Sequence, residues 1–179
     1  MPNLITDNVS SDPENQQERL VEIGWIIGFV DGEGCFSIGF VHQSDRLGRK
    51  GYKLRYQVFY EFAVTQGAKS FSSLEKIHKF FGVGSVVINK RYDNHKEHLY
   101  RYIVRKKEDL LKVIIPFFQK YQLQTSKRSD FEKFVQIVKL VDQKRHLERD
   151  GLIEILKIAE TMNTKKSRQD LIRILTHHT

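Results

Sequence analysis

The residues best suited to chemistry lie at the end of one predicted helix. The stretch GWIIGFVDGEGCF carries a glycine at every fourth position from Gly24 to Gly32, and the acids Asp31 and Glu33 lie on either side of Gly32. Negative charge at a helix C-terminus is opposed by the helix dipole, at a cost of a few tenths of a kcal/mol to ~1 kcal/mol. A bound cation would offset that charge, and Mg²⁺ prefers one or two carboxylates completed by water and phosphate oxygens. The residues alone leave two interpretations open, a metal site and an ordinary solvated turn.

The glycine stripe of the same helix also needs a reason. Each helical glycine costs roughly 1 kcal/mol relative to alanine. A row of glycines removes side chains from one face, so another backbone can approach it closely. That backbone could belong to the same chain, or it could be the same helix of a second subunit.

The elements that must position these residues follow from the spacing of apolar side chains. Asp12-Pro13 is typical of a helix start, and Asp31-Gly32-Glu33-Gly34 is expected to end that helix. The predicted elements, in order, are a helix (18–30), two strands (36–41 and 52–65), a helix (70–81), two strands (85–91 and 99–105) and four helices (108–120, 127–147, 152–159 and 169–175). This order predicts an α+β fold with an antiparallel sheet.

Composition favours a nucleic-acid partner and a reducing compartment. The 179 residues carry a net charge of +8 with a pI near 9.5, which is typical of nucleic-acid binders although many basic proteins never bind DNA. The single cysteine, Cys35, excludes an internal disulfide and a cysteine-based zinc site. No apolar run reaches the ~18 residues of a membrane span. The polar N-terminus lacks the pattern of a secretory signal, so we expect an intracellular protein.

The motif and the segments behind it resemble one family. IIGFVDGEG (26–34) is similar to the LAGLIDADG motif of homing endonucleases, and four later segments resemble landmarks of that family in the same order. These are FAVTQ (62–66), FGVG (81–84), PFF (116–118) and TSKRSDF (125–131). The resemblance implies an αββαββα fold with a four-stranded antiparallel DNA-binding saddle per subunit and extra C-terminal helices. It covers 17–165 as the endonuclease domain, leaving 1–16 as a flexible tail and 166–179 as a helical extension.

The resemblance also implies a reaction and a set of catalytic residues. Glu33 would be the metal-binding acid, with the Gly32 carbonyl as a further ligand; glutamate is a mild departure from the commoner aspartate. Gln66 would position a water, although a simple DNA or solvent contact is the other interpretation. Lys127 fits the basic residue near the scissile phosphate best and Lys120 is second, although either could be a phosphate clamp or a solvated lysine. The expected cofactor is Mg²⁺, with Mn²⁺ expected to substitute.

One copy of the motif implies a homodimer, because a cut in each strand requires one motif acid per strand. The residues expected at the dimer interface lie on the exposed stripe of the motif helix: Gly24, Ile27, Gly28 and Asp31. The target would be a long, near-palindromic double-stranded DNA site, cut to promote intron homing.

Strand alternation selects the face of the sheet expected to contact DNA. This set consists of strand and loop residues, nearly all of them polar. Side chains on the strands can read base edges, and basic loop residues can bind phosphates. Its members are Ser37, Gln43, Arg46, Arg49, Lys53, Gln57, Phe59, Glu61, Asn89, Arg91, Arg101 and Arg105. A solvated outer face is the other interpretation for any single strand.

Two other functions remain open on the same scaffold. An RNA-binding maturase would take intron RNA as its partner, and a DNA-binding regulator would bind without cutting. Retention of Glu33 and Gln66 favours the nuclease over both. We expect no membrane partner, and the compartment could be a chloroplast, a mitochondrion or a prokaryotic cytoplasm.

Overall fold

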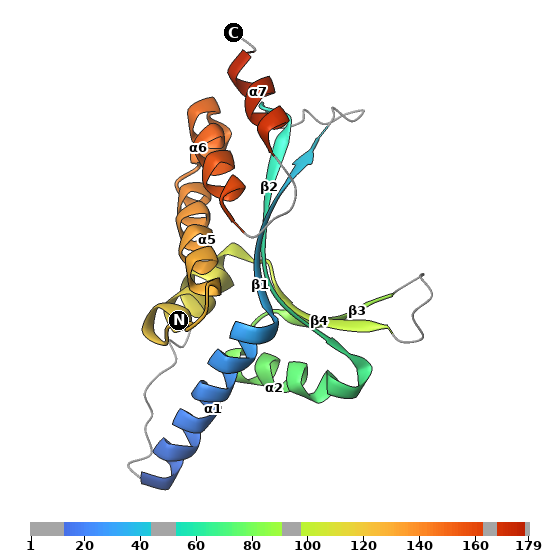
Figure 1. Cartoon of the computed structure of the whole chain (residues 1–179), viewed down its shortest axis with the longest axis vertical. Helices are drawn as coiled ribbons and strands as arrows, with labels where there is room; N and C mark the ends of the chain where they lie inside the picture. Colours follow the sequence, from blue (N-terminus) through green and yellow to red (C-terminus); the bar gives the residue numbers. More distant parts are fainter. Residues whose placement is uncertain (1–12, 44–52, 91–97, 163–167, 178–179) are drawn as a thin grey trace. The chain divides into compact units, whose positions relative to one another are not determined.

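A computed structural model describes residues 13–43, 53–90, 98–162 and 168–177 (Figure 1). The strands are β1 (Gly34–His42), β2 (Tyr56–Gly67), β3 (Ser85–Asn89) and β4 (Leu99–Val104), in one sheet of order β1-β2-β4-β3. The helices are α1 (Pro13–Glu33), α2 (Phe71–Phe81), α3 (Lys107–Asp109), α4 (Ile115–Lys120), α5 (Lys127–Asp142), α6 (Arg149–Glu160) and α7 (Gln169–His177). Short helical segments are η1 (Ala68–Ser70), η2 (Leu110–Ile114) and η3 (Arg145–Leu147). The predicted α+β class is confirmed.

The chain forms two compact units. The first contains residues 1–35 and 61–128, and the second contains residues 36–60 and 129–179. None of the helices in the described ranges has the length and apolar character needed to cross a lipid bilayer.

Helix α1 ends inside the cluster 31–34 that was expected to stop it. The apolar spacing predicted a helix over 18–30, and α1 extends to Glu33, with β1 beginning at Gly34. A Cβ on Gly34 would lie 2.6 Å from Cγ1 of Val30 and 2.7 Å from its carbonyl oxygen, so this abrupt change from helix to strand requires glycine. Glu33 is therefore the last residue of α1, next to the backbone carbonyl groups that have no hydrogen-bond partner within the helix.

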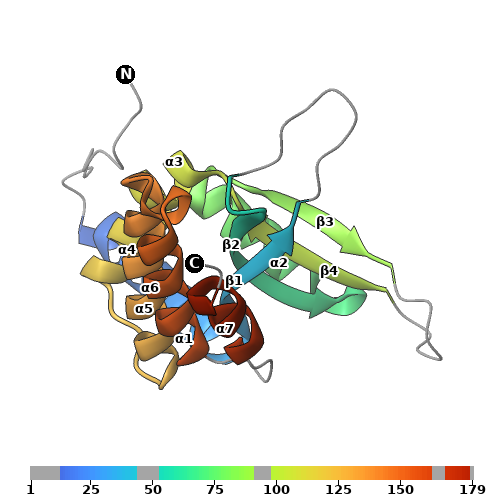
Figure 2. The same cartoon turned by 90° about the horizontal axis from the view of Figure 1, so that it is seen from above.

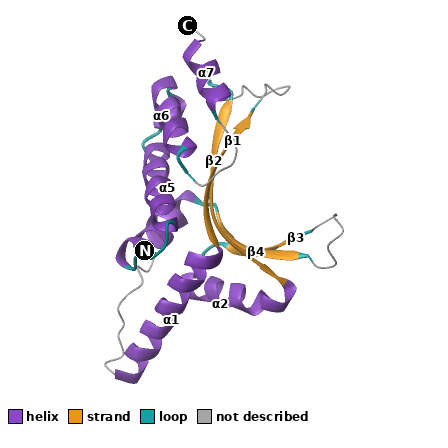
Figure 3. Ribbon diagram, in the orientation of Figure 1, coloured by secondary structure: helices purple, strands orange, loops and turns teal. Residues whose placement is uncertain are grey.

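The first unit packs α2 against one face of the strands β2, β4 and β3 (Figures 1 and 3). Phe62 and Tyr102 are fully buried on this face, and their rings meet Phe81 of α2 at centroid distances of 6.4 and 6.3 Å. The Tyr102 hydroxyl donates a 2.8 Å hydrogen bond to the Val83 carbonyl. Burial, together with the charge of Asp109, raises the pKa of Tyr102. Because side chains alternate along a strand, the residues next to Phe62 in β2 and next to Tyr102 in β4 face away from α2.

The predicted helix 108–120 is built from three segments, α3, η2 and α4. The middle segment has π geometry and ends at Ile114, two residues before Pro116, which is the second residue of α4. Proline cannot donate a backbone hydrogen bond and its ring crowds the preceding turn, so a widened turn at this place relieves the conflict.

In the second unit, α5 and α6 lie on the same side of the β1–β2 segment (Figures 1 and 2). Phe36 of β1 packs against Phe131 and Phe134 of α5, with ring centroids 5.1 and 5.4 Å apart. Helix α5 ends at Asp142 rather than at the predicted residue 147, because Lys144 adopts a left-handed conformation with φ of 62°.

Arg168, which directly precedes α7, joins β1 and α6 of the second unit. Its guanidinium donates hydrogen bonds to the Ile38 carbonyl of β1, at 2.9 Å, and to the Ala159 carbonyl of α6. It also lies over the Phe40 ring, 5.6 Å from the centroid. Desolvation lowers the pKa of Arg168, and the charge of Glu160 opposes that shift.

Candidate functional site

The C-terminal end of α1 presents an acid and a carbonyl to solvent. Gly32 and Glu33 are both exposed, and the last carbonyls of the helix have no partner within the helix. The helix has no basic residue in its last turn, so its own sequence leaves the negative end of the dipole without compensation. A cation supplied by another element is therefore favoured at this point.

Lys127 supplies such a cation. Its Nζ donates a hydrogen bond of 3.2 Å to the Gly32 carbonyl. Lys127 is the first residue of α5, where a positive charge is disfavoured by the dipole of its own helix. The Lys127 side chain therefore stabilises the end of α1, although its charge is unfavourable at the start of α5. The hydrogen bond holds the ammonium group at Gly32, the residue that precedes Glu33 in the sequence.

Asp31 fixes the segment that carries Lys127. Its carboxylate accepts hydrogen bonds from the Gln124 N–H at 2.7 Å, the Thr125 N–H at 3.2 Å and the Thr125 hydroxyl at 2.8 Å. The Thr125 hydroxyl oxygen in turn accepts a 3.2 Å hydrogen bond from the Lys127 N–H. The two motif acids thus differ in their surroundings: Asp31 orders the turn before α5, while Glu33 is exposed.

The other predicted catalytic residues lie on separate elements. Lys120 is exposed at the end of α4, with its Nζ 5.3 Å from the centroid of the Tyr121 ring. Gln66 is half-buried near the end of β2, opposite Tyr100 of β4. Of the two predicted lysines, Lys127 is the one whose described hydrogen bond reaches the motif.

The donor set at the end of α1 fits a hard cation with retained water. Glu33 offers a carboxylate and Gly32 a carbonyl oxygen that already attracts a positive group. The described residues contain no cluster of three or more histidine, cysteine, aspartate or glutamate side chains that could hold a metal by themselves. Magnesium, which keeps several waters and shares its ligands with phosphate oxygens, matches this sparse set.

The glycine stripe of α1 faces open space within the described part of the chain. A Cβ built on Gly24, Gly28 or Gly32 would meet no other atom within 4 Å among the described residues. The stripe therefore does not serve close packing within the described part of this chain. Leu20 and Val21, one turn earlier, are 63% and 67% exposed. Ile27 is half-buried, and the Asp31 carboxylate accepts hydrogen bonds from Gln124 and Thr125 of the same chain.

The register of β3 and β4 agrees with the predicted polar face. Arg101 of β4 lies opposite Val87 of β3 and Thr65 of β2, and Asn89 lies opposite Leu99. These positions alternate with Tyr102, whose side chain packs toward α2, so Arg101 and Asn89 face the other way. The same side of the strands therefore carries Arg101 and Asn89, as alternation predicted.

The remaining predicted contact residues fall into three groups. In the second unit, the Gln43 side-chain amide donates a 3.1 Å hydrogen bond to that of Gln57, while Ser37 and Phe59 are half-buried. Lys53 is exposed. The predicted contacts Arg46, Arg49 and Arg91 lie outside the described residues.

Glu61 occupies a different environment from the one expected of a direct DNA contact. It is the buried charged residue of the described core, at 3% exposure. Its Oε1 accepts a hydrogen bond from Nη2 of Arg101, and its Oε2 accepts one of 2.6 Å from Nε of Arg105. The alternation of side chains along the strands assigned Glu61, Arg101 and Arg105 to one face, which is enough to suggest that they pair. It could not show that Glu61 is buried beneath the two arginines.

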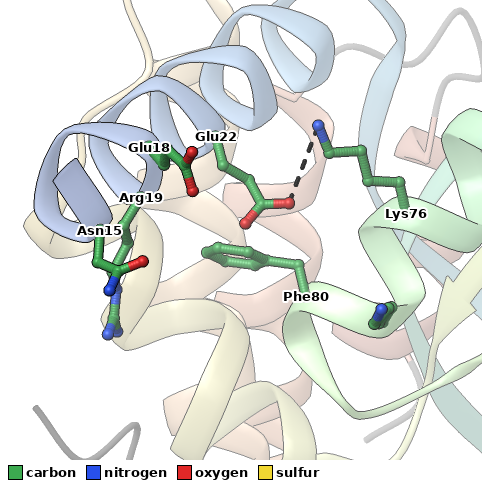
Figure 4. Close-up of a pocket in the computed structure, with 7 residues that line it drawn as sticks. Asn15, Glu18, Arg19, Glu22, Lys76 and Phe80 are labelled. Carbon is green, nitrogen blue, oxygen red and sulfur yellow. Dashed lines mark ion pairs between the residues drawn. The ribbon is translucent and has the colours of Figure 1, made fainter. Parts of the chain in front are cut away.

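A groove lies between the first half of α1 and α2 (Figure 4). Its volume is about 770 Å³, and its lining carries both signs of charge: Asn15, Glu18, Arg19, Glu22, Lys76, Lys79 and Phe80. Lys76 Nζ lies 3.9 Å from Oε1 of Glu22 and 4.5 Å from the centroid of the Trp25 ring. None of the predicted catalytic residues lines this groove.

Comparison with known proteins defines the family. The model of the LAGLIDADG endonuclease family matches residues 26–138. A Podospora anserina protein, described as an uncharacterized 50.9 kDa protein in ND4 intron 1, is 37% identical over 123 residues, covering 69% of this chain and 25% of that protein. A probable intron-encoded endonuclease 2 of Neurospora crassa is 31% identical over 138 residues, covering 77% and 26%.

Solved structures agree with this assignment. The homing endonuclease I-TnaI superposes with a TM-score of 0.69 at 36% identity, covering 86% of this chain and 95% of that one. The structure of I-SmaMI bound to uncleaved DNA target in the presence of calcium ions gives a TM-score of 0.71 at 31% identity, covering 85% and 48%. The chain belongs to the LAGLIDADG endonuclease family, and it spans about a quarter of the length of the two fungal relatives.

Proposed function

We propose that the chain is one subunit of a homodimeric homing endonuclease that cuts both strands of a long, near-palindromic DNA site. The observation that carries the proposal is the arrangement at the end of α1, where Lys127 donates to the Gly32 carbonyl beside the exposed Glu33. Hydrolysis of a phosphodiester develops negative charge on the phosphate. The end of α1 offers an acid and a carbonyl group that could hold a cation, and an ammonium group that could stabilise this charge. The family and the intron-encoded names of the relatives support intron homing.

Glu33 and the Gly32 carbonyl would hold Mg²⁺. The metal would supply an activated water and charge stabilisation at the phosphate. Lys127 would hold its ammonium group against the developing negative charge, because Asp31 and Thr125 fix the turn that precedes it. Gln66 would orient water from the end of β2. The structure of I-SmaMI with calcium and uncleaved DNA supports a divalent ion in this family.

Two copies of the chain would complete the enzyme. The given sequence carries one copy of the motif, and a cut in each strand of DNA requires one motif acid per strand. Gly24 and Gly28 leave open space on α1, and the neighbouring Leu20 and Val21 are exposed apolar side chains. This surface suits close approach of the same helix from a second subunit.

DNA would lie on the face of β2, β3 and β4 that is turned away from α2. This face bears Arg101, Arg105 and Asn89, and the chain as a whole has a net charge of +8. Basic side chains supply affinity for phosphates, whereas polar side chains in the major groove distinguish bases. We assign this function to residues 17–165, with 166–179 as a helical extension.

A cleavage selection tests the proposal. The wild-type protein is incubated with a randomised double-stranded DNA library in Mg²⁺, in Ca²⁺, and in Mg²⁺ as the Glu33→Gln variant. We expect double-strand cuts at one near-symmetric sequence in Mg²⁺, binding without cutting in Ca²⁺, and at least a 10³-fold slower cut by the variant, which has lost its metal-binding charge. Selective binding without cutting in every condition would instead identify a regulator. Affinity for structured intron RNA without DNA binding would identify a maturase.

A further inference from the structure

The face assigned to DNA contains a buried acid. Glu61 of β2 is 3% exposed, while Arg101 and Arg105 above it are 28% and 51% exposed. Each oxygen of the carboxylate holds one arginine: Oε1 accepts from Nη2 of Arg101 and Oε2 accepts from Nε of Arg105. A single acid thus joins two more exposed cations.

The strand register explains how one carboxylate reaches both arginines. Phe62 pairs with Val104 and Thr65 pairs with Arg101, so continuation of the register sets Arg105 opposite Glu61. Arg105 is therefore a cross-strand neighbour, and Arg101 reaches Glu61 from four positions along the same face. A carboxylate in this buried position needs charge-assisted partners, because an unpaired charge below the surface is strongly unfavourable.

We propose that Glu61 is a specificity-determining residue that acts through Arg101 and Arg105 rather than by touching bases. The inference rests on the proposed function, since it requires DNA on this face. A guanidinium is planar with five N–H donors in a fixed fork, so holding one donor fixes the directions of the others. Bidentate recognition of a guanine edge depends on that orientation.

The carboxylate also reduces the nonspecific attraction of this patch for DNA. The three side chains carry a net charge of +1 where two free arginines would carry +2, and phosphate attraction depends on the number of cations rather than on their geometry. Glu61 would thus weaken binding to any sequence while it preserves contacts that require fixed arginines. Both effects raise the ratio of specific to nonspecific affinity.

The test compares Glu61→Gln with a charge-matched control, Glu75→Gln, which removes one negative charge from the exposed surface of α2. Dissociation constants are measured by fluorescence anisotropy in Ca²⁺, for the DNA duplex selected by the wild-type protein and for a random-sequence duplex, at several salt concentrations. Circular dichroism verifies that each variant is folded.

We expect Glu61→Gln to bind random DNA severalfold more tightly, with a steeper salt dependence, and to bind the selected duplex no more tightly than the wild type does. The ratio of the two affinities should fall about tenfold or more, which is within the usual discrimination by a bidentate arginine. The control should leave this ratio within twofold of the wild type.

An unchanged ratio in a folded Glu61→Gln variant would overturn the inference while leaving the proposed function intact. Absence of selective DNA binding by the wild type would overturn both. If Glu61→Gln does not fold, Glu61→Asp keeps the negative charge and both arginines but shortens the side chain by one methylene, so that the carboxylate can no longer hold Arg101 and Arg105 in the same geometry. A loss of ratio is expected there as well, and a preserved ratio in the folded variant would refute the role of Glu61.

Discussion

Replacement of Asp31 by alanine should destabilise the protein measurably, although its side chain is only half-buried. The carboxylate accepts three hydrogen bonds from Gln124 and Thr125, at 2.7, 2.8 and 3.2 Å. At roughly 1 kcal/mol each, these bonds contribute about 3 kcal/mol. Removing an acid from the last turn of α1 returns ~0.5 kcal/mol, because the helix dipole opposes negative charge there. The expected net loss is about 2–2.5 kcal/mol.

Thermal unfolding followed by circular dichroism measures this loss. For a chain of this size, about 2 kcal/mol corresponds to a fall in Tm of roughly 4–8 °C. The matched control is Glu75→Ala, an exposed acid on α2, which should shift stability by less than ~0.5 kcal/mol. Sedimentation at the same protein concentration separates a change in dimerisation from a change in the fold of the subunit.

Asp31→Ala should also slow cleavage at a temperature at which the variant is folded. The turn at Thr125 would lose its anchor, and the Lys127 side chain would no longer be held at the Gly32 carbonyl. We expect the rate of the chemical step to fall at least tenfold while the affinity for the DNA target changes by less than threefold. A variant with wild-type Tm and wild-type cleavage rate would refute this account of Asp31.

Three further changes test other parts of the structure. Lys127→Met should slow cleavage about 10²-fold in single-turnover assays with target binding largely retained, whereas Lys120→Met should have less than a threefold effect; equal losses would contradict the assignment. Gly28→Leu should yield a folded monomer in sedimentation experiments, because a Cβ at this position meets nothing within the subunit; a stable dimer would exclude this helix face from the interface. Arg168→Met should lower the free energy of unfolding in urea by about 2–3 kcal/mol through loss of two carbonyl partners, and the exposed Arg173→Met should not.

The sequence was informative wherever local spacing determines structure. The order of helices and strands follows from apolar periodicity, and the motif with its landmarks indicated the family that the comparison confirmed. The cluster 31–34 marked the end of α1, where Gly34 permits an immediate change from helix to strand and Asp31 and Glu33 lie in the last turn. Other element ends were less predictable. Lys144 adopts a left-handed conformation that ends α5 early, and no local signal marks it.

Long-range contacts could not be predicted from spacing. Alternation placed Glu61, Arg101 and Arg105 on one face, but their burial order depends on how the strands pack in three dimensions. The hydrogen bond between Arg168 and the Ile38 carbonyl joins residues 130 positions apart. The contact between Lys127 and Gly32 supports the choice of that lysine, which the sequence left open against Lys120.

A mixed dimer tests the central claim most directly. Wild-type and Glu33→Gln subunits carrying different affinity tags are combined, the mixed species is isolated by both tags, and its products on the selected duplex are resolved strand by strand. If each subunit cuts one strand with its own Glu33, the mixed dimer should nick a single strand at the wild-type rate and produce almost no double-strand breaks. Efficient cutting of both strands by the mixed dimer, or by a monomeric wild-type protein, would contradict the account.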